Sequence, residues 1–219
     1  MSATGRPKAE GAKTVRNDED TYLTPPRCAL VLASLIELHA DDLTLEPSAG
    51  SGSFVVATHQ AHGLVITAVE KRREAAPALR TCIPGHEVAV RTCRFEDVLE
   101  PNRYDAILGN PPYVKAQAHV EHALYLLRRD GLLGFLLRIN FLASQERYEF
   151  FRRFPPWRVY VLRERPDFTG EGGDATEYAF MVWRKGYTGD TVTRWVSWKD
   201  EALSAADIAR VRELDWAQE

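Results

Sequence analysis

The sequence predicts an α/β domain, in which a mostly parallel sheet carries helices on both faces. Short β-rich runs alternate with helix-like stretches along most of the chain, which is the rhythm of repeated β-α-β units. The apolar run GLLGFLL, residues 131–137, has the composition of a strand buried on both faces. A glycine-containing loop at 48–52 separates the first predicted strand from a helix. Strands joined by helices in this way form a parallel sheet.

The first half of the chain contains four predicted strands and three predicted helices. The strands are residues 43–45, 64–69, 87–91 and 104–108. The helices are residues 28–38, 54–62 and 74–81, of which the last is weak because a proline interrupts it. Pro25 and Pro26 suit a helix N-terminus, so Thr24 is expected to cap the first helix.

The second half adds one helix, three strands and a C-terminal extension. The helix is predicted at 120–127, and the strands at 131–137, 159–162 and 178–183. The loop between the last two contains Gly170, Gly172 and Gly173 and is long for a hairpin, which favours a functional loop. An edge strand at 191–198 and a capped helix at 204–214 follow. We therefore divide the chain into a flexible tail (1–20), a catalytic domain (21–187) and an extension packed on the same domain (188–219).

The composition restricts the class of protein. A chain of 219 residues, 45% of them hydrophobic, is long enough for one domain with a substantial core. No apolar run reaches the roughly eighteen residues of a membrane span, and the N-terminus lacks the apolar region of a signal peptide, so a cytoplasmic protein is expected. Cys28, Cys82 and Cys93 have no metal-ligand spacing, so no metal is expected. The net charge of −3 leaves room only for a local basic face.

The stretch TLEPSAGSGSF, residues 44–54, predicts a ligand site after the first strand. Gly50 and Gly52 permit a tight turn and close approach of a ligand to the backbone. Val55 occupies the place of a third glycine, so a dinucleotide site is not indicated. Glu70 ends the second strand, where it can accept both hydroxyls of a ribose, and Asp97 follows the third strand, where it can accept the amino group of an adenine. These residues predict a cleft for an adenosine-containing molecule that need not carry phosphates.

S-adenosylmethionine is a molecule of this kind. Its methyl group is already activated by the sulfonium, so a protein has only to align an acceptor atom and exclude water.

The stretch DAILGNPPYVK, residues 105–115, predicts how an acceptor atom is prepared. Pro111 and Pro112 cannot continue a strand, because neither has an N–H group to donate to a neighbouring strand. The side-chain oxygen of Asn110 and the carbonyl of Pro111 are two rigidly held acceptors. Aimed at the two hydrogens of an aromatic amine, they localise the lone pair on its nitrogen, and Tyr113 can stack on the ring. The sequence therefore predicts an amine-polarising loop at the end of the fourth strand.

The segments TYLTPP, LEPSAGSGSF, AVE, EDVLEP and YDAILGNPPYV, in that order, resemble the amino-methyltransferases that act on adenine in DNA and have their cofactor motifs before NPPY. The resemblance covers roughly residues 22–185. It implies a Rossmann-like methyltransferase fold with a mostly parallel seven-stranded sheet and an antiparallel final strand. It also implies S-adenosylmethionine as the cofactor and DNA as the partner, with the target base flipped out of the duplex.

The resemblance assigns roles to individual residues. Those assigned to the cofactor are Thr24, Glu46, Pro47, Ala49, Gly50, Gly52, Glu70, Asp97 and Asn110, and those assigned to catalysis are Asn110, Pro111, Pro112 and Tyr113. Those assigned to the substrate are Tyr113, Lys115, Tyr148 and Phe168. A second aromatic residue clamps the base in this family, and within RINFLASQERYEFF we favour Tyr148 over Phe141. The segment RPDFTGEGGDATEYAFMVW resembles small orphan enzymes of phages and mobile elements, which places Phe168 near the substrate face.

Two features depart from the family pattern. Larger members carry a separate target-recognition domain after the catalytic fold, for which this chain has no room. Sequence specificity must then come from short loops, a separate specificity subunit or a homodimer, or be low. Ala49 stands where an aromatic residue commonly precedes the first glycine, so the affinity for the cofactor is expected to differ.

Other interpretations stay open. The same amino-methyl chemistry occurs on ribosomal RNA and on a glutamine of release factors, and TYLTPP is the feature that favours DNA. An inactive methyltransferase-fold subunit that only binds nucleic acid is a further alternative, against which the intact NPPY motif argues. Basic residues at 71–73 and the arginines at 147–165 predict either a solvated face or a rim that contacts phosphates. Trp157, Trp183, Trp195 and Trp198 are predicted to pack in the core.

Overall fold

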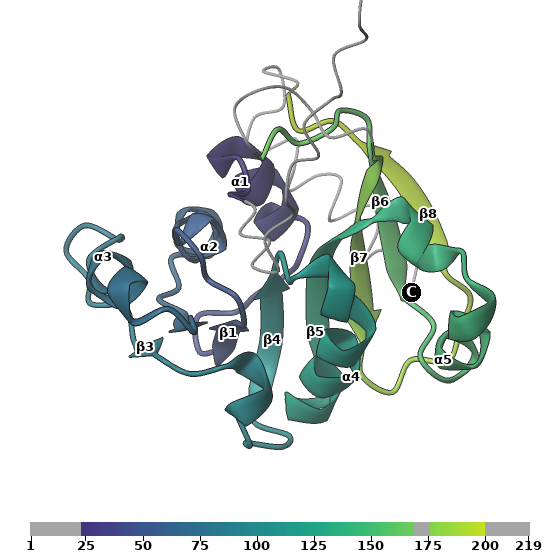
Figure 1. Ribbon diagram of the computed structural model, residues 1–219, viewed down its shortest axis with the longest axis horizontal. Helices are drawn as coiled ribbons and strands as arrows, with labels where there is room; N and C mark the ends of the chain where they lie inside the picture. Colours follow the sequence, from purple (N-terminus) through teal and green to yellow (C-terminus); the bar gives the residue numbers. More distant parts are fainter. Residues whose placement is uncertain (1–22, 169–175, 200–219) are drawn as a thin grey trace, which may run out of the picture.

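A sheet of eight strands runs through the computed structural model of the chain, within the residues that the structure describes, 23–168 and 176–199 (Figure 1). The strands are β1 (Thr44–Glu46), β2 (Thr67–Val69), β3 (Val90–Arg91), β4 (Tyr104–Gly109), β5 (Leu127–Arg138), β6 (Arg158–Leu162), β7 (Tyr178–Arg184) and β8 (Val192–Val196). Their order across the sheet is β3-β2-β1-β4-β5-β7-β6-β8. The chain therefore builds outward from β1 to β3 and then returns to the other side of β1 with β4.

The sheet is mostly parallel, as predicted. β7 lies between β5 and β6 and runs antiparallel to both, whereas the other neighbouring pairs are parallel. The predicted count of seven strands is too low, because the described residues contain an eighth strand, β8, which pairs with the open edge of β6. This strand is the edge strand that the sequence predicts at 191–198. The α/β class is confirmed.

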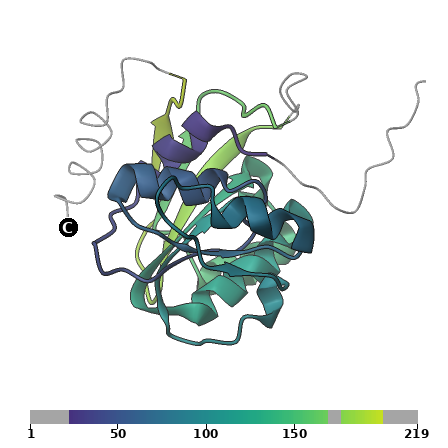
Figure 2. The same cartoon turned by 90° about the vertical axis from the view of Figure 1, so that its left-hand side faces the viewer.

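Helices cover both faces of the sheet. They are α1 (Pro26–Ser34), α2 (Ser53–His62), α3 (Ala76–Arg80), α4 (Ala116–Leu126) and α5 (Tyr148–Arg153). α1 and α2 pack on the face that carries Leu108 and Leu136, and α4 and α5 pack on the face that carries Ile107 and Leu133. In Figure 2, α1 and α2 (purple and blue) lie on the upper side of the sheet and α4 (teal) lies below it. The sheet is thus buried between two helical layers.

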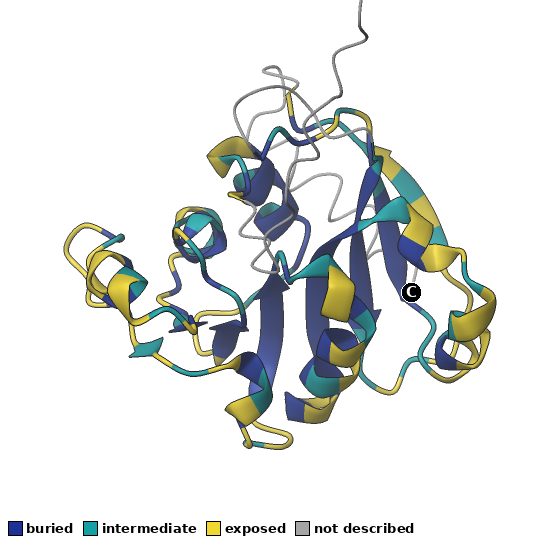
Figure 3. Cartoon of the chain, in the orientation of Figure 1, coloured by how far each residue is buried: buried dark blue, intermediate teal, exposed yellow. Residues whose placement is uncertain are grey.

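The apolar run at 131–137 is the centre of β5 and is buried on both faces, as predicted. Leu132 and Leu136 belong to the core on the α1 side, and Leu133, Phe135 and Leu137 to the core on the α4 side. Figure 3 shows the central strands in dark blue between yellow outer helix surfaces. The strand begins earlier than predicted because its pairing with β4 starts at the first residue of β5 and the register then shifts across the charged residues 128–130.

The start of α1 differs from the prediction. Pro25, rather than Thr24, occupies the position before the helix, and no side chain caps it. Thr24 is buried and accepts a hydrogen bond from another part of the chain. The helix also ends at Ser34, before the predicted 38, although Leu35 and Ile36 remain buried beyond it.

Other differences concern boundaries. β2 and β3 are shorter than predicted, since their ladder holds only Ala68↔Val90 and Val69↔Arg91. α4 begins before the predicted residue 120, because a 3-10 turn at Tyr113–Lys115 leads directly into it. The predicted tail (1–20), loop glycines (170, 172 and 173) and terminal helix (204–214) lie outside the described residues. Within the described ranges no helix combines the length and the apolar character needed to cross a membrane.

A larger side chain at Gly134, in the middle of β5, is expected to destabilise the fold. A Cβ atom there would collide with the side chains of Ile36, Phe180 and Leu108. We expect Gly134→Val to lower the free energy of unfolding by about 1–3 kcal/mol, the usual cost of overpacking a core. Thr193→Val, at an exposed position of β8, is the control and should change it by less than about 0.5 kcal/mol. Urea denaturation measures both values, and unchanged stability of the Gly134 variant would contradict this packing.

Candidate functional site

The carboxyl ends of β1, β2 and β4 bring the predicted site residues together. β1 pairs with β2 on one side and with β4 on the other, so the strand order reverses at β1. In open α/β sheets, ligands bind outside the carboxyl ends of the strands where the order reverses. The loop at 48–52 follows β1, Glu70 follows β2 and Asn110 follows β4. The fold therefore brings these three groups to one end of the sheet, where ligands bind in proteins of this architecture.

The glycine loop turns tightly and is tied to the strand beside it. The Ala49 amide donates to the Val69 carbonyl at 2.9 Å, and the Gly52 amide donates to the Ala49 carbonyl at 2.7 Å. Gly50 and Gly52 have φ values of +54° and +89°, a backbone conformation that residues other than glycine rarely adopt. Among the described residues, a Cβ at Gly50 would have no atom closer than 3.9 Å, whereas one at Gly52 would press on Leu79. The loop is thus fixed from behind and open in front of Gly50.

Glu70 is buried and held by the glycine loop and by Arg72. One carboxylate oxygen accepts from the Gly50 amide at 2.9 Å, and the other accepts from the Arg72 amide and from Arg72 Nε, each at 2.9 Å. Arg72 Nη2 lies 3.3 Å from the first oxygen. Burial alone would raise the pKa of Glu70, but the hydrogen bonds and charge of Arg72, together with the Gly50 amide, lower it below its ordinary value. Glu70 is therefore a carboxylate, and Arg72 covers it.

Glu46 at the end of β1 is in the opposite electrostatic state. Its side chain is 2% exposed, and one oxygen accepts from the Ser48 amide at 3.0 Å. Burial, with a smaller contribution from the charge of Glu70, raises the pKa of Glu46 to about 8. The carboxyl group lies against Gly109 of β4, and any side chain at that position would overlap it. Glu46 is thus protonated at neutral pH in a space that the glycine provides.

Asn110 follows β4 with its amide fixed on one side only. Its Nδ2 group donates to Thr24 Oγ1 at 3.1 Å, which explains why Thr24 is buried here instead of capping α1. Its Oδ1 atom is buried and has no hydrogen-bond partner among the described residues. A buried acceptor without a partner costs about 1–3 kcal/mol, so a donor supplied by a ligand would stabilise it.

The two prolines and Tyr113 complete the loop after β4. Pro111 is buried, and the Pro112 carbonyl accepts from the Lys115 amide at 3.1 Å, which starts the turn toward α4. The half-buried ring of Tyr113 lies 5.7 Å from the ring of Tyr178, and the guanidinium of Arg138 lies over it at 5.1 Å. Arg138, which the sequence analysis did not single out, is thus part of the site. Its position at the carboxyl end of the apolar β5 run was the available signal.

The remaining predicted residues lie around this centre in different settings. Asp97 is exposed in a 3-10 turn after β3, and Lys115 is exposed with its ammonium 2.8 Å from Glu96. Tyr148 is exposed at the start of α5, whereas Phe141 is buried in an aromatic cluster. Phe168 is buried and packs edge-on against Tyr178, the ring that also contacts Tyr113.

Pro47 connects β1 with the loop, so β1, β2, β4 and their loops gather most of the predicted cofactor residues. The geometry leaves Asp97, Lys115 and Tyr148 at the periphery.

The packing prediction for the tryptophans is wrong at one position. Trp157, Trp183 and Trp198 are buried, as predicted, but the side chain of Trp195 on β8 is 74% exposed. Edge strands expose one of their faces, and the alternation along β8 places Trp195 on the exposed one.

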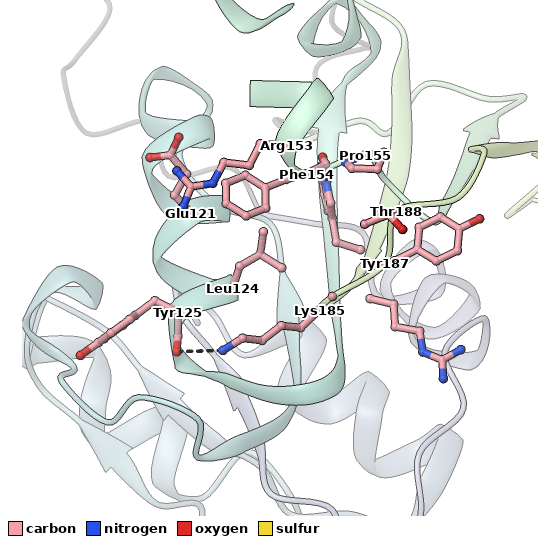
Figure 4. Close-up of a pocket in the computed structure, with 12 residues that line it drawn as sticks. Glu121, Leu124, Tyr125, Arg153, Phe154, Pro155, Lys185, Tyr187 and Thr188 are labelled. Atoms are coloured by element: carbon pink, nitrogen blue, oxygen red, sulfur yellow. Dashed lines mark hydrogen bonds between the residues drawn. The ribbon is translucent and has the colours of Figure 1, made fainter. Parts of the chain in front are cut away.

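A separate cavity of about 470 Å³ lies at the opposite end of the sheet (Figure 4). It is lined by the C-terminal end of α4, the end of α5 and the turn after β7, including Tyr125, Phe154 and Tyr187. Lys185 is one of the lining residues, and its ammonium donates to the Leu127 carbonyl at 2.6 Å. No residue of the candidate site lines this cavity, so it is not part of that site.

Comparison with known proteins identifies the fold. No protein-family model matches the chain, and no curated protein matches it. Among solved structures, a protein assigned as a type I restriction-enzyme modification subunit from Vibrio vulnificus is similar with a TM-score of 0.66 and 13% identity, over 92% of this chain and 54% of that one. A protein assigned as an O-methyltransferase from Agrobacterium tumefaciens is similar with a TM-score of 0.59 and 19% identity, over 84% and 96%. The 23S rRNA methyltransferase ErmE is similar with a TM-score of 0.60 and 18% identity, over 88% and 76%. The chain therefore has the methyltransferase fold.

The raised pKa of Glu46 predicts a pH-dependent stability. Between the ordinary pKa of a glutamate and about 8, the unfolded chain is ionised at this residue and the folded chain is not. Folding then takes up a proton, so the contribution of Glu46 is fully present below the ordinary value and is lost as pH rises toward 8, by about 1.4 kcal/mol per pH unit at most. Glu46→Gln keeps an acceptor for the Ser48 amide. This variant should make the free energy of unfolding less dependent on pH and should raise it at pH 8. Denaturant titrations at pH 5, 6.5 and 8 measure it, and parallel curves for both proteins would contradict a protonated Glu46.

Proposed function

We propose that the chain transfers a methyl group from S-adenosylmethionine to the exocyclic amine of adenine in DNA. The observation that carries the proposal is the buried, unpartnered Oδ1 of Asn110 at the carboxyl end of β4, directly before two prolines and an aromatic residue. The described residues offer this acceptor no donor, and an amine would supply one.

The residues around Asn110 fit the proposed cofactor. The loop is open in front of Gly50, the ionised Glu70 lies beside it, and the Asn110 acceptor lies across the β1–β4 junction. Glu70 would hold the ribose hydroxyls, Asp97 the adenine amino group, and Glu46, Pro47 and the loop the remainder, with Thr24 orienting Asn110. The bound cofactor supplies a methyl group activated by a sulfonium.

The chain's own contribution is to prepare the accepting nitrogen. Asn110 Oδ1 and the Pro111 carbonyl accept the two N–H groups of the amine, so its lone pair is no longer shared with the ring. That pair would then be available to the activated methyl group that a bound cofactor supplies, and the nitrogen would afterwards lose one proton to solvent. Tyr113 would stack on the base, which requires Arg138 to move from the ring face it now covers.

Two kinds of nucleic acid compete as substrate. The likeness to a type I modification subunit supports DNA, and the likeness to a 23S rRNA methyltransferase supports RNA as the alternative. The TYLTPP segment, whose Thr24 holds Asn110, is the feature that favours DNA. A specificity subunit or a second copy of the chain would supply sequence recognition, and an inactive binding subunit is the alternative outside catalysis.

Asn110→Ala tests the proposed chemistry. Without the side-chain acceptor, the rate of methyl transfer should fall about 100-fold or more, the scale of losing one preorganised polar contact to a reacting group. Gln60→Ala removes an exposed amide on α2 and should leave the rate unchanged. The assay supplies labelled S-adenosylmethionine with DNA, RNA or protein, followed by nucleoside and amino-acid analysis. Methylcytosine without methyladenine would refute the choice of base, label in RNA alone would refute DNA, and full binding of DNA without any transfer would support the inactive subunit.

Arg72→Ala tests the assignment of Glu70. Arg72 fills the carboxylate positions that ribose hydroxyls would use, so the side chain has to be displaced when the cofactor binds. We expect the variant to bind S-adenosylmethionine about two- to fivefold more tightly, the worth of a partly exposed ion pair. Lys71→Ala, at the adjacent exposed position, should bind like the wild type. Calorimetric titration measures both, and weaker binding by the Arg72 variant would mean that Arg72 holds the cofactor rather than competing with it.

A further inference from the structure

The eighth strand carries an exposed tryptophan whose position the fold does not require. Trp195 pairs in register with Val161 of β6. Paired residues on neighbouring strands point to the same face, and Val159 and Val161 belong to the core on the α4 and α5 side. Trp195 therefore lies on that side of the sheet, beyond the cover of the helices, where its indole is 74% exposed.

The direction of the strands brings Trp195 to the same edge of the sheet as Asn110. β8 is parallel to β6, and both are antiparallel to β7, as are β4 and β5. Trp195 is the next-to-last residue of β8, so it lies near the carboxyl edge where Asn110 follows β4. The chain leaves β5 at this edge, and α5 then runs toward the start of β6 at the other edge.

The chain segment that passes this edge has more basic than acidic residues, although the whole protein is acidic. Residues 138–167 contain seven arginines and four acidic residues, against a net charge of −3 for the full sequence, but Arg152, Arg153 and Arg158 lie in α5 and at the start of β6, toward the other edge. Arg163 follows β6, and its amide donates to the Val196 carbonyl at 2.9 Å, which places it beside the end of β8. Its side chain is 72% exposed, with Nε 3.5 Å from Glu164. An exposed indole next to an exposed guanidinium suits a nucleotide, since the ring offers a stacking surface and the arginine a phosphate contact.

We infer that Trp195 and Arg163 form an accessory nucleic-acid contact that binds a nucleotide flanking the target base. The inference rests on the proposed function and extends the contact from the Asn110 loop across the carboxyl edge to β8. Trp195 stacks on the face of a base, and Arg163 exchanges its contact with Glu164 for one with a phosphate. Neither residue touches the reacting atoms, so both act on substrate binding.

Trp195→Ala and Trp195→Phe, compared with Tyr125→Ala, test this contact. Tyr125 is also an exposed aromatic residue but lies at the opposite end of the sheet, beside the cavity of Figure 4. The probes are fluorescently labelled random-sequence oligonucleotides, single-stranded and duplex, with binding followed by anisotropy and methyl transfer measured as KM and kcat.

The expected result is about tenfold weaker binding and a higher KM for Trp195→Ala, from the loss of one stacked base. Its kcat should not change, Trp195→Phe should restore most of the affinity, and Tyr125→Ala should behave as wild type. Arg163→Ala should weaken binding and reduce its salt dependence by about one phosphate contact.

Wild-type binding and KM in Trp195→Ala, in a protein that does methylate nucleic acid, would overturn the inference and leave the proposed function standing. Absence of transfer to any nucleic acid by the wild type would instead overturn the proposed function. A further outcome is a wild-type dimer that Trp195→Ala converts to a monomer without changing oligonucleotide binding per chain. That result would show that the indole contacts a second copy, and it would also overturn the inference. Sedimentation of both proteins measures that outcome.

Discussion

The pairing of β1 with β4 is the constraint on which the candidate site depends. Their register, Thr44↔Ala106 and Leu45↔Ile107, makes Glu46 and Gly109 neighbours at the point where both strands end. A shift of one residue would bring a leucine against the buried carboxyl group, for which there is no space, and would turn the apolar side chains of β4 to the wrong faces. The same register sends the glycine loop and Asn110 out of the sheet side by side. One strand pair thus positions groups that are about sixty residues apart in the chain.

Two neighbouring carboxyl groups are held in different protonation states by their surroundings. Among the described residues, Glu46 has one amide donor and no cation beside it, and its burial keeps it neutral. Glu70 receives donors from Gly50 and Arg72, and these keep it ionised in spite of burial. Of the two carboxyl groups only Glu70 is then charged, and Arg72 pairs with it, so the two glutamates and Arg72 together add no net positive charge of the kind that a phosphate needs. The absence of a third glycine at Val55 leads to the same conclusion from the sequence.

The sequence predicted those features of the fold that depend on the chemistry of neighbouring residues in the chain. The two prolines stop β4 where predicted, and the run at 131–137 had to be buried on both faces because it has no polar side chain to expose. The sequence did not predict the contacts of three residues whose partners are fixed by the tertiary structure, namely Thr24, Arg72 and Arg138. A threonine before two prolines caps a helix by default, and only the tertiary contact with Asn110 gives it another role. The start of β5 was missed because pairing with β4, rather than propensity, admits charged residues to a strand. Trp195 was misassigned because tryptophan usually packs and the sequence does not show which face of an edge strand is covered.

The residues of β8 include one, Trp195, that an edge strand does not require. β8 pairs with β6 and so satisfies backbone groups that would otherwise form an open edge. Val192 and Val196 are half-buried on the covered side, which is enough to fix the strand in register. A strand with only that task would carry polar residues on its exposed face, as it does at Thr193. A large apolar ring exposed at the next position of that face adds no packing and increases the contact of apolar surface with water. Its presence at the carboxyl edge, beside Arg163, is therefore better explained by an external contact than by the stability of the sheet.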